Sequence, residues 1–528
     1  MRLRAAPATA LLGVLLGALL SVFPCAIAPV FAQSSPAAAG SAPASPMFTI
    51  NEYVIDGDNP IGDAAARAVL APFLGPNVSL ERLQAAAEAL ELALHDAGHG
   101  FYRVVVPPQE GEGKVRLKTL AFTVGTVSVR NNQSFSEANI RASLPALREG
   151  TSPNTAVLAR DLALANENPS KRVVAAFKQG EKPDTVDANL ETTDSRPLSA
   201  TLSVANTGTQ TTGMSRATFA VSHANLFDRD HQGTFSYTTS PERPSQVEQF
   251  GAYYRVPVYG WGGMVSAYYS TSTVNSGTVA NFFNVTGRGT FMGITYTQYF
   301  APRGDYRDYV TIGIDDKYFD NSQLPGSLNS IRSRPIAVSY TARNDASWGV
   351  WGFNADYARN WAAGGANDSA IYGVGPPAGA SAQWDAWRFG GDLSARLPRD
   401  WLFNGRVRGQ WARSPMIAGE QFGVGGAQSV RGFLERAVGG DAGVQASVEL
   451  WTPPLVEGLR LLGFVDYGRI YNHAGRLPVG ELSSVGVGVR WQAGSNVSLS
   501  TDYAQVQRGI GTTVRGHDRL HVSLLLRF

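Results

Sequence analysis

Cysteine is almost absent from this chain of 528 residues, and its single cysteine lies in a segment that is predicted to be removed. Two arginines precede an apolar run near the start, and Val30 and Ala32 supply the small side chains of a cleavage site. Residues 1–32 are therefore predicted to be a secretory signal peptide. The residues before Cys25 are not the small ones that a lipid-attachment site needs. The remaining chain is expected to contain no disulfide, no thiolate metal site and no lipid anchor.

Net charge is also lacking. Removing Arg2 and Arg4 with the signal peptide reduces Lys plus Arg from 45 to 43, which equals the 43 Asp plus Glu. A neutral chain has no basic field for nucleic acid, so no nucleic-acid partner is expected. Beyond the signal peptide, no apolar run approaches the roughly 18 residues that a membrane helix needs. The 57 glycines and the 10% of aromatic residues instead suit many short strands and tight turns.

Motifs for catalysis and for cofactor binding are missing too. The sequence holds no Gly-x-Ser-x-Gly elbow, no phosphate loop and no His-Glu-x-x-His pattern. His95 and His99 have the four-residue spacing of metal ligands on a helix, but Gly98 is predicted to end that helix. No third ligand is evident nearby. We therefore expect no metal, no cofactor and no catalytic residue.

What the sequence does contain begins with a flexible segment and two similar units. Residues 33–46 consist mainly of Ser, Pro, Ala and Gly, which predicts a flexible linker. Residues 47–122 and 123–196 each follow the order strand, helix, helix, strand, strand. Each unit is predicted to be a small α+β domain with three strands. In the first unit, the second helix is predicted to begin after Ser79 and to end before Gly98.

From residue 197 onward, helical periodicity gives way to alternating strands. We predict sixteen strands in residues 197–528. Connections after even-numbered strands are short, as at 228–230 and 494–496, whereas several after odd-numbered strands are long, notably 362–382 and 414–440. Short turns that alternate with long loops, in an even number of strands, indicate an antiparallel transmembrane β-barrel of a bacterial outer membrane, with its short turns facing the periplasm.

One of the short turns holds the remaining candidates for catalysis. Asp228, Asp230 and His231 could suggest an acid and base pair like that of outer-membrane proteases. They lie in a predicted periplasmic turn, where turn formation and solvation explain them better. The prediction is a solvated turn.

The last strand agrees with a barrel of this kind. Leu520, Val522, Leu524 and Leu526 share one face, and polar side chains alternate with them. A strand of this pattern that is closed by the aromatic Phe528 is typical of the final strand of an outer-membrane barrel. The apolar face is expected to contact outer-membrane lipid, and Phe528 is expected to be the signal that the barrel assembly machinery reads.

A family resemblance rests on the longest loop, over residues 414–440, and on the strands after it. Its motif residues are Gly425, Gly426, Val430, Arg431, Gly432, Phe433, Asp441 and Gly443. The pattern closely resembles the corresponding loop of two-partner secretion transporters of the haemolysin and filamentous-haemagglutinin type. The sequence from Phe464 to Gly468 resembles that family's Phe-x-Asp-x-Gly strand. The two small units resemble its polypeptide-transport-associated (POTRA) domains.

The resemblance implies an outer-membrane transporter that uses no nucleotide. Such a protein captures one large, unfolded exoprotein in the periplasm through the exoprotein's N-terminal secretion domain, and exports it through the barrel pore. The exoprotein could be an adhesin, a haemolysin or a contact-dependent toxin, and whether transport activates it stays open. Unpaired sheet edges in the small domains could add a strand from the unfolded chain.

The resemblance also implies a lumenal ion pair. In relatives the loop folds into the barrel, where its arginine meets the aspartate of the strand motif; here these residues are Arg431 and Asp466. The alternation along the strand agrees, because Asp466 lies on the opposite face of the strand from the apolar Val465 and Tyr467. Gly425 and its neighbouring glycines are expected to give a tight loop tip its backbone freedom.

One expected difference from some relatives lies before the first small domain. Some relatives carry a plug helix there, but Pro and Gly interrupt residues 33–46, so no plug helix is expected.

Two other functional classes remain beside partner-protein transport. A barrel-assembly or insertion factor of the same superfamily is the main alternative function, and it usually carries more than two such domains. An outer-membrane barrel enzyme or a porin is the third, and a porin would not need the two domains.

Overall fold

The computed structural model describes residues 47–528, except for 110–112, 280–282, 321–329, 375–378 and 474–479. The predicted signal peptide, the predicted linker and the expected lack of a plug helix lie outside the described residues. Among the residues that are described, no helix is long and apolar enough to cross a membrane.

The first small domain has a four-stranded sheet against which two helices pack. Its elements are β1 (Phe48–Asp56), α2 (Asp63–Leu70), the 3₁₀ helix η1 (Ala71–Phe73), β2 (Gly75–Val78), α3 (Leu80–Asp96), β3 (Tyr102–Val105) and β4 (Gly113–Ala121), with sheet order β2-β1-β4-β3. The predicted ends of α3 are confirmed. Ser79 Oγ accepts a hydrogen bond from the Arg82 N–H at 3.3 Å, and Gly98 beyond the helix has φ 89°. The apolar stripe of α3, with Leu90 and Leu94 fully buried, forms the core with the sheet.

The prediction of three strands in this domain is wrong by one. The additional strand, β2, pairs antiparallel with the start of β1, where Phe48 faces Val78. Its sequence Gly-Pro-Asn-Val reads as a turn because Gly, Pro and Asn are depleted in strands. The pairing reaches only to Ile50, so in the described part of the domain the outer edge of β1 has no strand partner from Asn51 to Asp56.

The second small domain repeats the plan with a three-stranded sheet. Its elements are β5 (Thr123–Arg130), α4 (Glu137–Ala142), α5 (Thr155–Ala165), β6 (Lys171–Gln179) and β7 (Thr185–Asp194), in sheet order β5-β7-β6. The first helix, α4, is short and ends at Ala142. Pro145 disfavours helical backbone at the residue before it, which explains why the helix does not continue.

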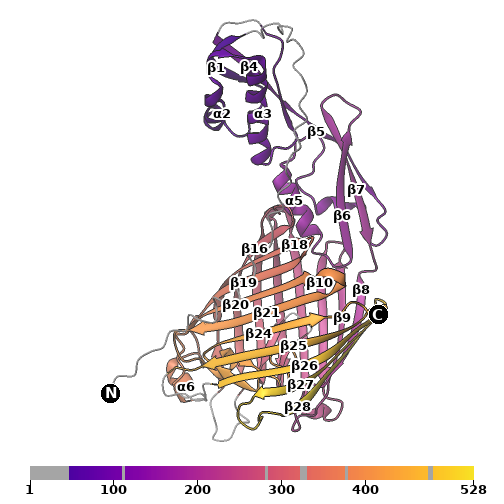
Figure 1. Cartoon of the computed structure of the whole chain (residues 1–528), viewed down its shortest axis with the longest axis vertical. Helices are drawn as coiled ribbons and strands as arrows, with labels where there is room; N and C mark the ends of the chain where they lie inside the picture. Colours follow the sequence, from indigo (N-terminus) through magenta and orange to yellow (C-terminus); the bar gives the residue numbers. More distant parts are fainter. Residues whose placement is uncertain (1–46, 110–112, 280–282, 321–329, 375–378, 474–479) are drawn as a thin grey trace, which may run out of the picture. The chain divides into compact units, whose positions relative to one another are not determined.

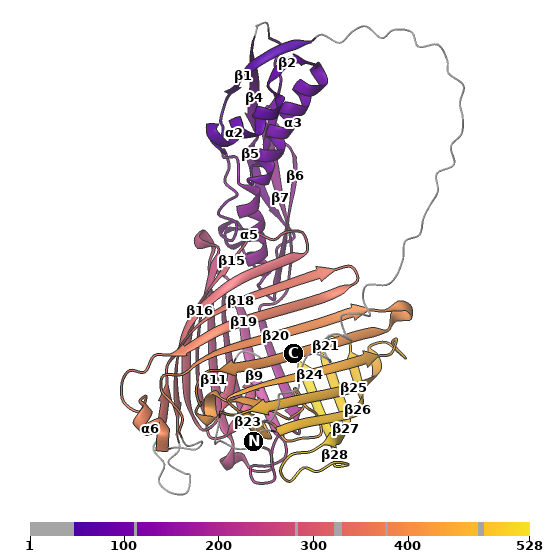
Figure 2. The ribbon, with the colours of Figure 1, turned by 60° about the vertical axis from the view of Figure 1, so that its left-hand side comes forward.

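The rest of the described chain forms a closed antiparallel barrel, which Figures 1 and 2 show as a wall of tilted strands. Its strands are β8 (Leu198–Ala205), β9 (Arg216–Leu226), β10 (His231–Thr239), β11 (Glu248–Val258), β12 (Gly263–Ser272), β15 (Gly289–Tyr299), β16 (Tyr306–Phe319), β17 (Ile331–Ser333), β18 (Pro335–Ala346), β19 (Gly349–Asn360), β20 (Asp385–Arg396), β21 (Leu402–Ala412), β24 (Ala442–Trp451), β25 (Leu459–Tyr471), β26 (Gly480–Ala493), β27 (Val497–Arg508) and β28 (Asp518–Arg527). Both β17 and β18 pair with β16 as successive parts of one strand. The described residues therefore give sixteen wall strands, which confirms the predicted fold class.

The connections alternate in length as predicted. The short turns, such as the one between β26 and β27, lie at one end of the barrel. The long loops lie at the other end, and one of them carries α6 (Ser369–Val374). Two further strands, β13 (Asn275–Val279) and β14 (Phe283–Thr286), form a hairpin in the loop between β12 and β15.

The wall alternates between apolar outward and mixed inward side chains. On β25, Val465 is 55% exposed while Asp466 is fully buried. Phe464 and Leu462 follow the inward parity of Asp466, and Leu461 follows the outward parity of Val465. An apolar outer face of this kind belongs in lipid.

The barrel closes between β28 and β8, the last and first wall strands. Five residue pairs join them, from Ser523 with Ala205 to Arg527 with Thr201. Phe528 extends the seam, because its N–H donates to the Ala200 carbonyl at 2.9 Å and its own carbonyl accepts from Ala200 at 3.2 Å. The Phe528 side chain itself is 72% exposed.

Candidate functional site

The loop between β21 and β24 folds back against the inner wall of the barrel. It contains η5 (Ala418–Glu420) and a short hairpin of β22 (Phe422–Val424) with β23 (Val438–Gly440). Val430, Arg431 and Phe433 are each no more than 2% exposed. A solvated surface loop would leave these side chains in water, so specific contacts hold this one.

Arg431 forms a bidentate ion pair with Asp466 of β25. Its Nε donates to Asp466 Oδ2 at 2.7 Å, and its Nη2 donates to Oδ1 at 2.8 Å. The backbone N–H of Arg431 also donates to Oδ2 at 3.0 Å. Two parallel bonds to one carboxylate fix the orientation of the guanidinium as well as its charge. The structure thus brings together the two residues that the sequence motif paired.

Two further carboxylates and a ring surround the same guanidinium. Arg431 Nη1 lies 2.8 Å from Glu449 Oε1 of β24 and 3.4 Å from Asp502 Oδ1 of β27. Its Cζ lies 3.4 Å from the centroid of the Phe464 ring, a cation–π contact. Arg490 shares Asp502 through contacts of 2.8 and 3.0 Å. One buried cation is therefore held by three strands.

Sequence reasoning did not assign roles to Glu449, Asp502 or Phe464. A signal for them exists in strand parity, because the exposed Val448 and Tyr503 mark the outward positions beside them. The alternation shows which residues point into the barrel but not how far along the barrel axis each one lies. It therefore could not single out Glu449, Asp502 and Phe464.

The tip of the loop also contacts the last strand. The N–H of Gly432 donates to Nε2 of His521 on β28 at 3.0 Å. His521 is 4% exposed, and an accepting Nε2 means that its ring is neutral. The sequence placed His521 on the polar side of the last strand without a role.

Apolar contacts also hold the loop against the inner wall of the barrel. Val424, Val430, Phe433 and Val438 of the loop cluster with Ile470, Leu482 and Val506 of the wall. Gly468 makes room for them, since a Cβ there would lie 2.4 Å from Val424 Cγ1 and 3.1 Å from Val430 Cγ2. The glycine of the strand motif is thus the recess into which the loop fits.

The other glycines of the motif bend the backbone. Gly425, Gly426 and Gly432 have φ of 111°, 109° and 95°, in a region that disfavours residues with a side chain. Gly443 of β24 instead leaves room for the Phe422 ring, because a Cβ at this position would lie 2.7 Å from Phe422 Cδ1.

Asp441 holds the end of the loop. Its Oδ1 accepts from the Met416 N–H at 2.9 Å, and its Oδ2 accepts from the His473 N–H at 3.1 Å. Its own N–H donates to Asn472 Oδ1 at 3.0 Å. Asp441 therefore ties the start of the loop to its end and to the loop after β25.

The two histidines that had the spacing of metal ligands make structural contacts within the first small domain. His95 Nε2 lies 3.0 Å from the Tyr102 carbonyl oxygen, and the His99 ring meets the Tyr102 ring edge-on at 5.6 Å. Tyr102 itself donates to Asp58 at 2.5 Å, and burial raises the pKa of Tyr102 to about 12. Within the described ranges, no group of three His, Cys, Asp or Glu residues could hold a metal ion.

The expectation of a solvated turn at 228–231 is wrong for Asp230. This carboxylate is 1% exposed, and its Oδ2 accepts from Lys171 Nζ and from the Tyr259 hydroxyl, each at 2.5 Å. Lys171 also donates to Asn139 Oδ1 at 2.9 Å, and its burial lowers its pKa. Lys171 is 59 residues away in the sequence, so no local pattern could show the pair. The turn is a junction to the second small domain.

These features define an outer-membrane β-barrel transporter with POTRA domains. More specifically, the chain belongs to the haemolysin secretion/activation protein family ShlB/FhaC/HecB, which matches residues 184–491, more than half of its length. Residues 48–120 match the ShlB-type POTRA domain.

Individual relatives agree with the family. The outer membrane transporter CdiB of Dickeya dadantii (strain 3937) is 24% identical over 455 residues, which cover 83% of this chain and 79% of the relative. Among solved structures, CdiB from Escherichia coli has a TM-score of 0.75 at 18% identity and covers 94% of this chain and 93% of its own. CdiB from Acinetobacter baumannii has a TM-score of 0.71 at 16% identity, with 92% and 91% covered. At these identities the structures establish the fold.

The predicted function and location are confirmed by the family. The protein is a two-partner secretion transporter of the bacterial outer membrane, which exports a large exoprotein through its β-barrel and carries POTRA domains in the periplasm. The family match favours this function over that of a barrel-assembly factor.

Proposed function

We propose that the loop between β21 and β24 closes the pore at rest and that Arg431 holds it closed. The observation that carries this proposal is the burial of Arg431 among Asp466, Glu449 and Asp502 on the inner wall. A chain that passes through the barrel needs the space that this loop fills. Export would therefore require the loop to move, and the ion pair would return it afterwards.

We propose further that the first small domain captures the exoprotein along the free edge of β1. A groove of about 480 Å³ lies between β1 and α2, and its apolar lining includes Val54, Leu70 and Leu74. Within the described residues no strand pairs with the edge beside it, so the backbone N–H and C=O groups of this edge are available to an added strand. An extended segment of the exoprotein's N-terminal secretion domain could add to this edge with little sequence demand, while apolar side chains enter the groove.

The remaining assignments complete the proposal. The cargo would be an adhesin, a haemolysin or a contact-dependent toxin, carried as a large unfolded exoprotein. We assign no catalytic step to this chain, because the acidic turn and the two histidines are used in structural contacts. The barrel assembly machinery would read Phe528 during insertion, and residues 1–32 would direct secretion to the periplasm.

The capture site is tested by variants of its groove. Val54→Asp and Leu74→Asp place charge in the apolar groove, and Leu92→Asp places it on α3 outside the groove lining, where Leu92 is 61% exposed. The probe is the unfolded N-terminal secretion domain of the large exoprotein that this transporter exports. Burial of one apolar side chain is worth about 1.5–3 kcal/mol, so the groove variants should bind at least tenfold more weakly. Unchanged binding by both, with Leu92→Asp as the reference, would place capture elsewhere.

A further inference from the structure

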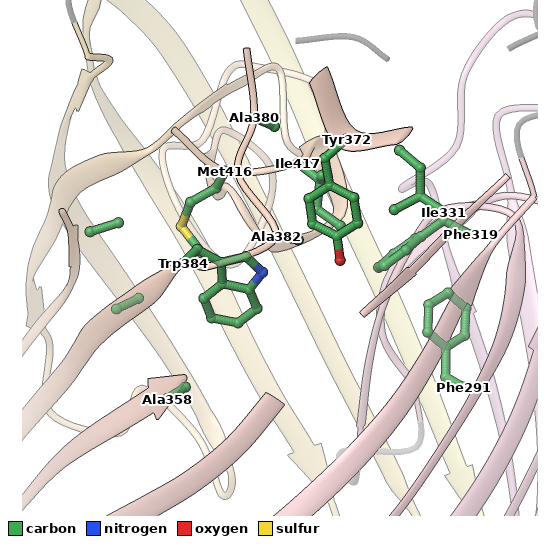
Figure 3. Close-up of a cluster of buried hydrophobic side chains, with 12 residues drawn as sticks. Phe291, Phe319, Ile331, Ala358, Tyr372, Ala380, Ala382, Trp384, Met416 and Ile417 are labelled. Carbon is green, nitrogen blue, oxygen red and sulfur yellow. The ribbon is translucent and has the colours of Figure 1, made fainter. Parts of the chain in front are cut away.

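The lumenal loop has a second buried charge, at the other end of its path. Its upstream arm, residues 413–421, leaves β21 and packs on the side of the barrel that holds β16, β17 and β20. Figure 3 shows Met416 against Trp384, and Ile417 beside Tyr372 of α6, in a cluster that also contains Phe319 and Ile331. A Cβ on Gly419 would lie 2.2 Å from the Phe319 ring, so the arm is in close contact with β16.

Glu420 ends this arm with a carboxylate that is 2% exposed. Its Oε1 accepts from Lys317 Nζ of β16 at 3.1 Å and from Ser333 Oγ of β17 at 3.2 Å. Its Oε2 accepts from Arg388 Nη2 of β20 at 2.9 Å. A buried carboxylate with two cations and a hydroxyl around it is fully paired, and such a pair fixes position because removing one side leaves a buried charge uncompensated.

The two charged residues that anchor the loop have opposite signs and contact different strands of the barrel wall. Arg431 is a cation among carboxylates of β24, β25 and β27, and Glu420 is an anion among cations of β16 and β20. The strands that Glu420 contacts extend from β16 to β20, those that Arg431 contacts extend from β24 to β27, and β21 stands between the two sets. The outermost of these strands, β16 and β27, lie on opposite sides of the closed barrel order, so the loop reaches across the lumen between them.

We propose that Glu420 is a second positioning residue of the pore closure and holds the upstream arm against β16 and β20 independently of Arg431. This inference rests on the proposed function, because it assumes that the docked loop obstructs the pore. If it is right, loss of Glu420 frees the upstream arm while the Arg431 anchor stays in place. The pore then opens partly and more often, instead of losing its loop altogether.

The test is channel recording on purified full-length protein in planar bilayers, with export measured on the same variants. Glu420→Gln keeps the size of the side chain and removes its charge, and Glu457→Gln removes the same charge from an exposed turn. We expect Glu420→Gln to raise the ratio of open to closed time about tenfold and Glu457→Gln to leave it unchanged. Export, normalised to the heat-modifiable barrel, should also fall with Glu420→Gln.

A charge exchange separates positioning from loss of stability. Glu420→Lys with Lys317→Glu and Arg388→Glu reverses the polarity of both ion pairs, and it should bring the open-to-closed ratio closer to that of the unchanged protein than Glu420→Lys alone. If Glu420→Gln does not assemble, Lys317→Gln with Arg388→Gln tests the same contact from the wall. A normal ratio in Glu420→Gln, or in the wall variant, overturns the inference, and so does a failed exchange.

The same recordings distinguish this inference from the proposal beneath it. If Arg431→Ala changes the ratio and Glu420→Gln does not, the loop closes the pore but Glu420 does not position it. If neither variant changes the ratio, the loop is no closure and both ideas fail.

Discussion

The ion cluster around Arg431 allows a prediction about the order of severity among its variants. Arg431→Ala leaves Asp466 and Glu449 in one buried site without their ion-pair partner, while Asp502 keeps its contact with Arg490. Asp466→Ala leaves Arg431 with two carboxylates, at 2.8 and 3.4 Å. Loss of the arginine should therefore be worse than loss of its best partner.

The magnitudes follow from burial. Removing one side of a buried pair costs about 3–5 kcal/mol, which applies to Arg431→Ala because the carboxylates lose their cation. Asp466→Ala removes one carboxylate but leaves the guanidinium paired with Glu449 and Asp502, so the loss should not exceed the lower end of that range, about 3 kcal/mol. Since about 1.4 kcal/mol changes an equilibrium tenfold, Arg431→Ala should shift the docked loop toward the undocked state by more than a hundredfold.

The double variant measures the coupling. Arg431→Ala with Asp466→Ala removes one of the two carboxylates, Asp466 and Glu449, that lose their ion-pair partner in Arg431→Ala, so it should be no worse than Arg431→Ala alone. Residues in one network are not additive, whereas independent residues would give a loss near the sum of the two.

The assay is export of the exoprotein into the medium, divided by the amount of heat-modifiable barrel in the outer membrane. Arg408→Ala is the matched control, because Arg408 is an exposed arginine on the inward parity of β21, next to the exposed, outward Val407. Normal export by Arg431→Ala would refute the role of the pair. A defect in Asp466→Ala larger than that of Arg431→Ala, or fully additive losses, would refute the account of the cluster.

Much of the fold is predictable from the sequence because a barrel strand repeats every two residues. Apolar and polar positions alternate on one strand, as at Val465 and Asp466, so the count of strands and the short turns follow from local patterns. The prediction failed where local signals conflict with pairing. The strand β2 has the composition of a turn and forms only because the start of β1 is available to pair with it.

The candidate site is predictable only in part. Arg431 and Asp466 came from a motif, and parity placed Asp466 on the inward side. The other partners depend on the register between strands, which sets Ser447 opposite Asp466 and Glu449 opposite Phe464. Asp230 shows the same limit, because nothing near it in the sequence reveals that Lys171 neutralises it.

Two more predictions follow from buried contacts. Lys171→Met leaves the Asp230 carboxylate buried without its cation, so it should lower the free energy of unfolding by about 3–5 kcal/mol. Lys171→Met with Asp230→Leu should recover most of this loss. Thermal unfolding and the protease sensitivity of the second small domain measure both effects, and no change in Lys171→Met would contradict the pairing. Gly468→Val should displace the loop, because the new Cβ lies 2.4 Å from Val424 Cγ1 in a packed cluster, and overpacking of this kind costs about 1–3 kcal/mol. Gly463→Ala is its control on the outward face of the same strand, where the nearest atom to a new Cβ is 4.0 Å away. Gly468→Val should therefore assemble a barrel but show a raised open-to-closed ratio and reduced export, and Gly463→Ala should show neither. If the two variants behave alike, the recess at Gly468 is not where the loop docks, and the closure would depend on the charged anchors alone.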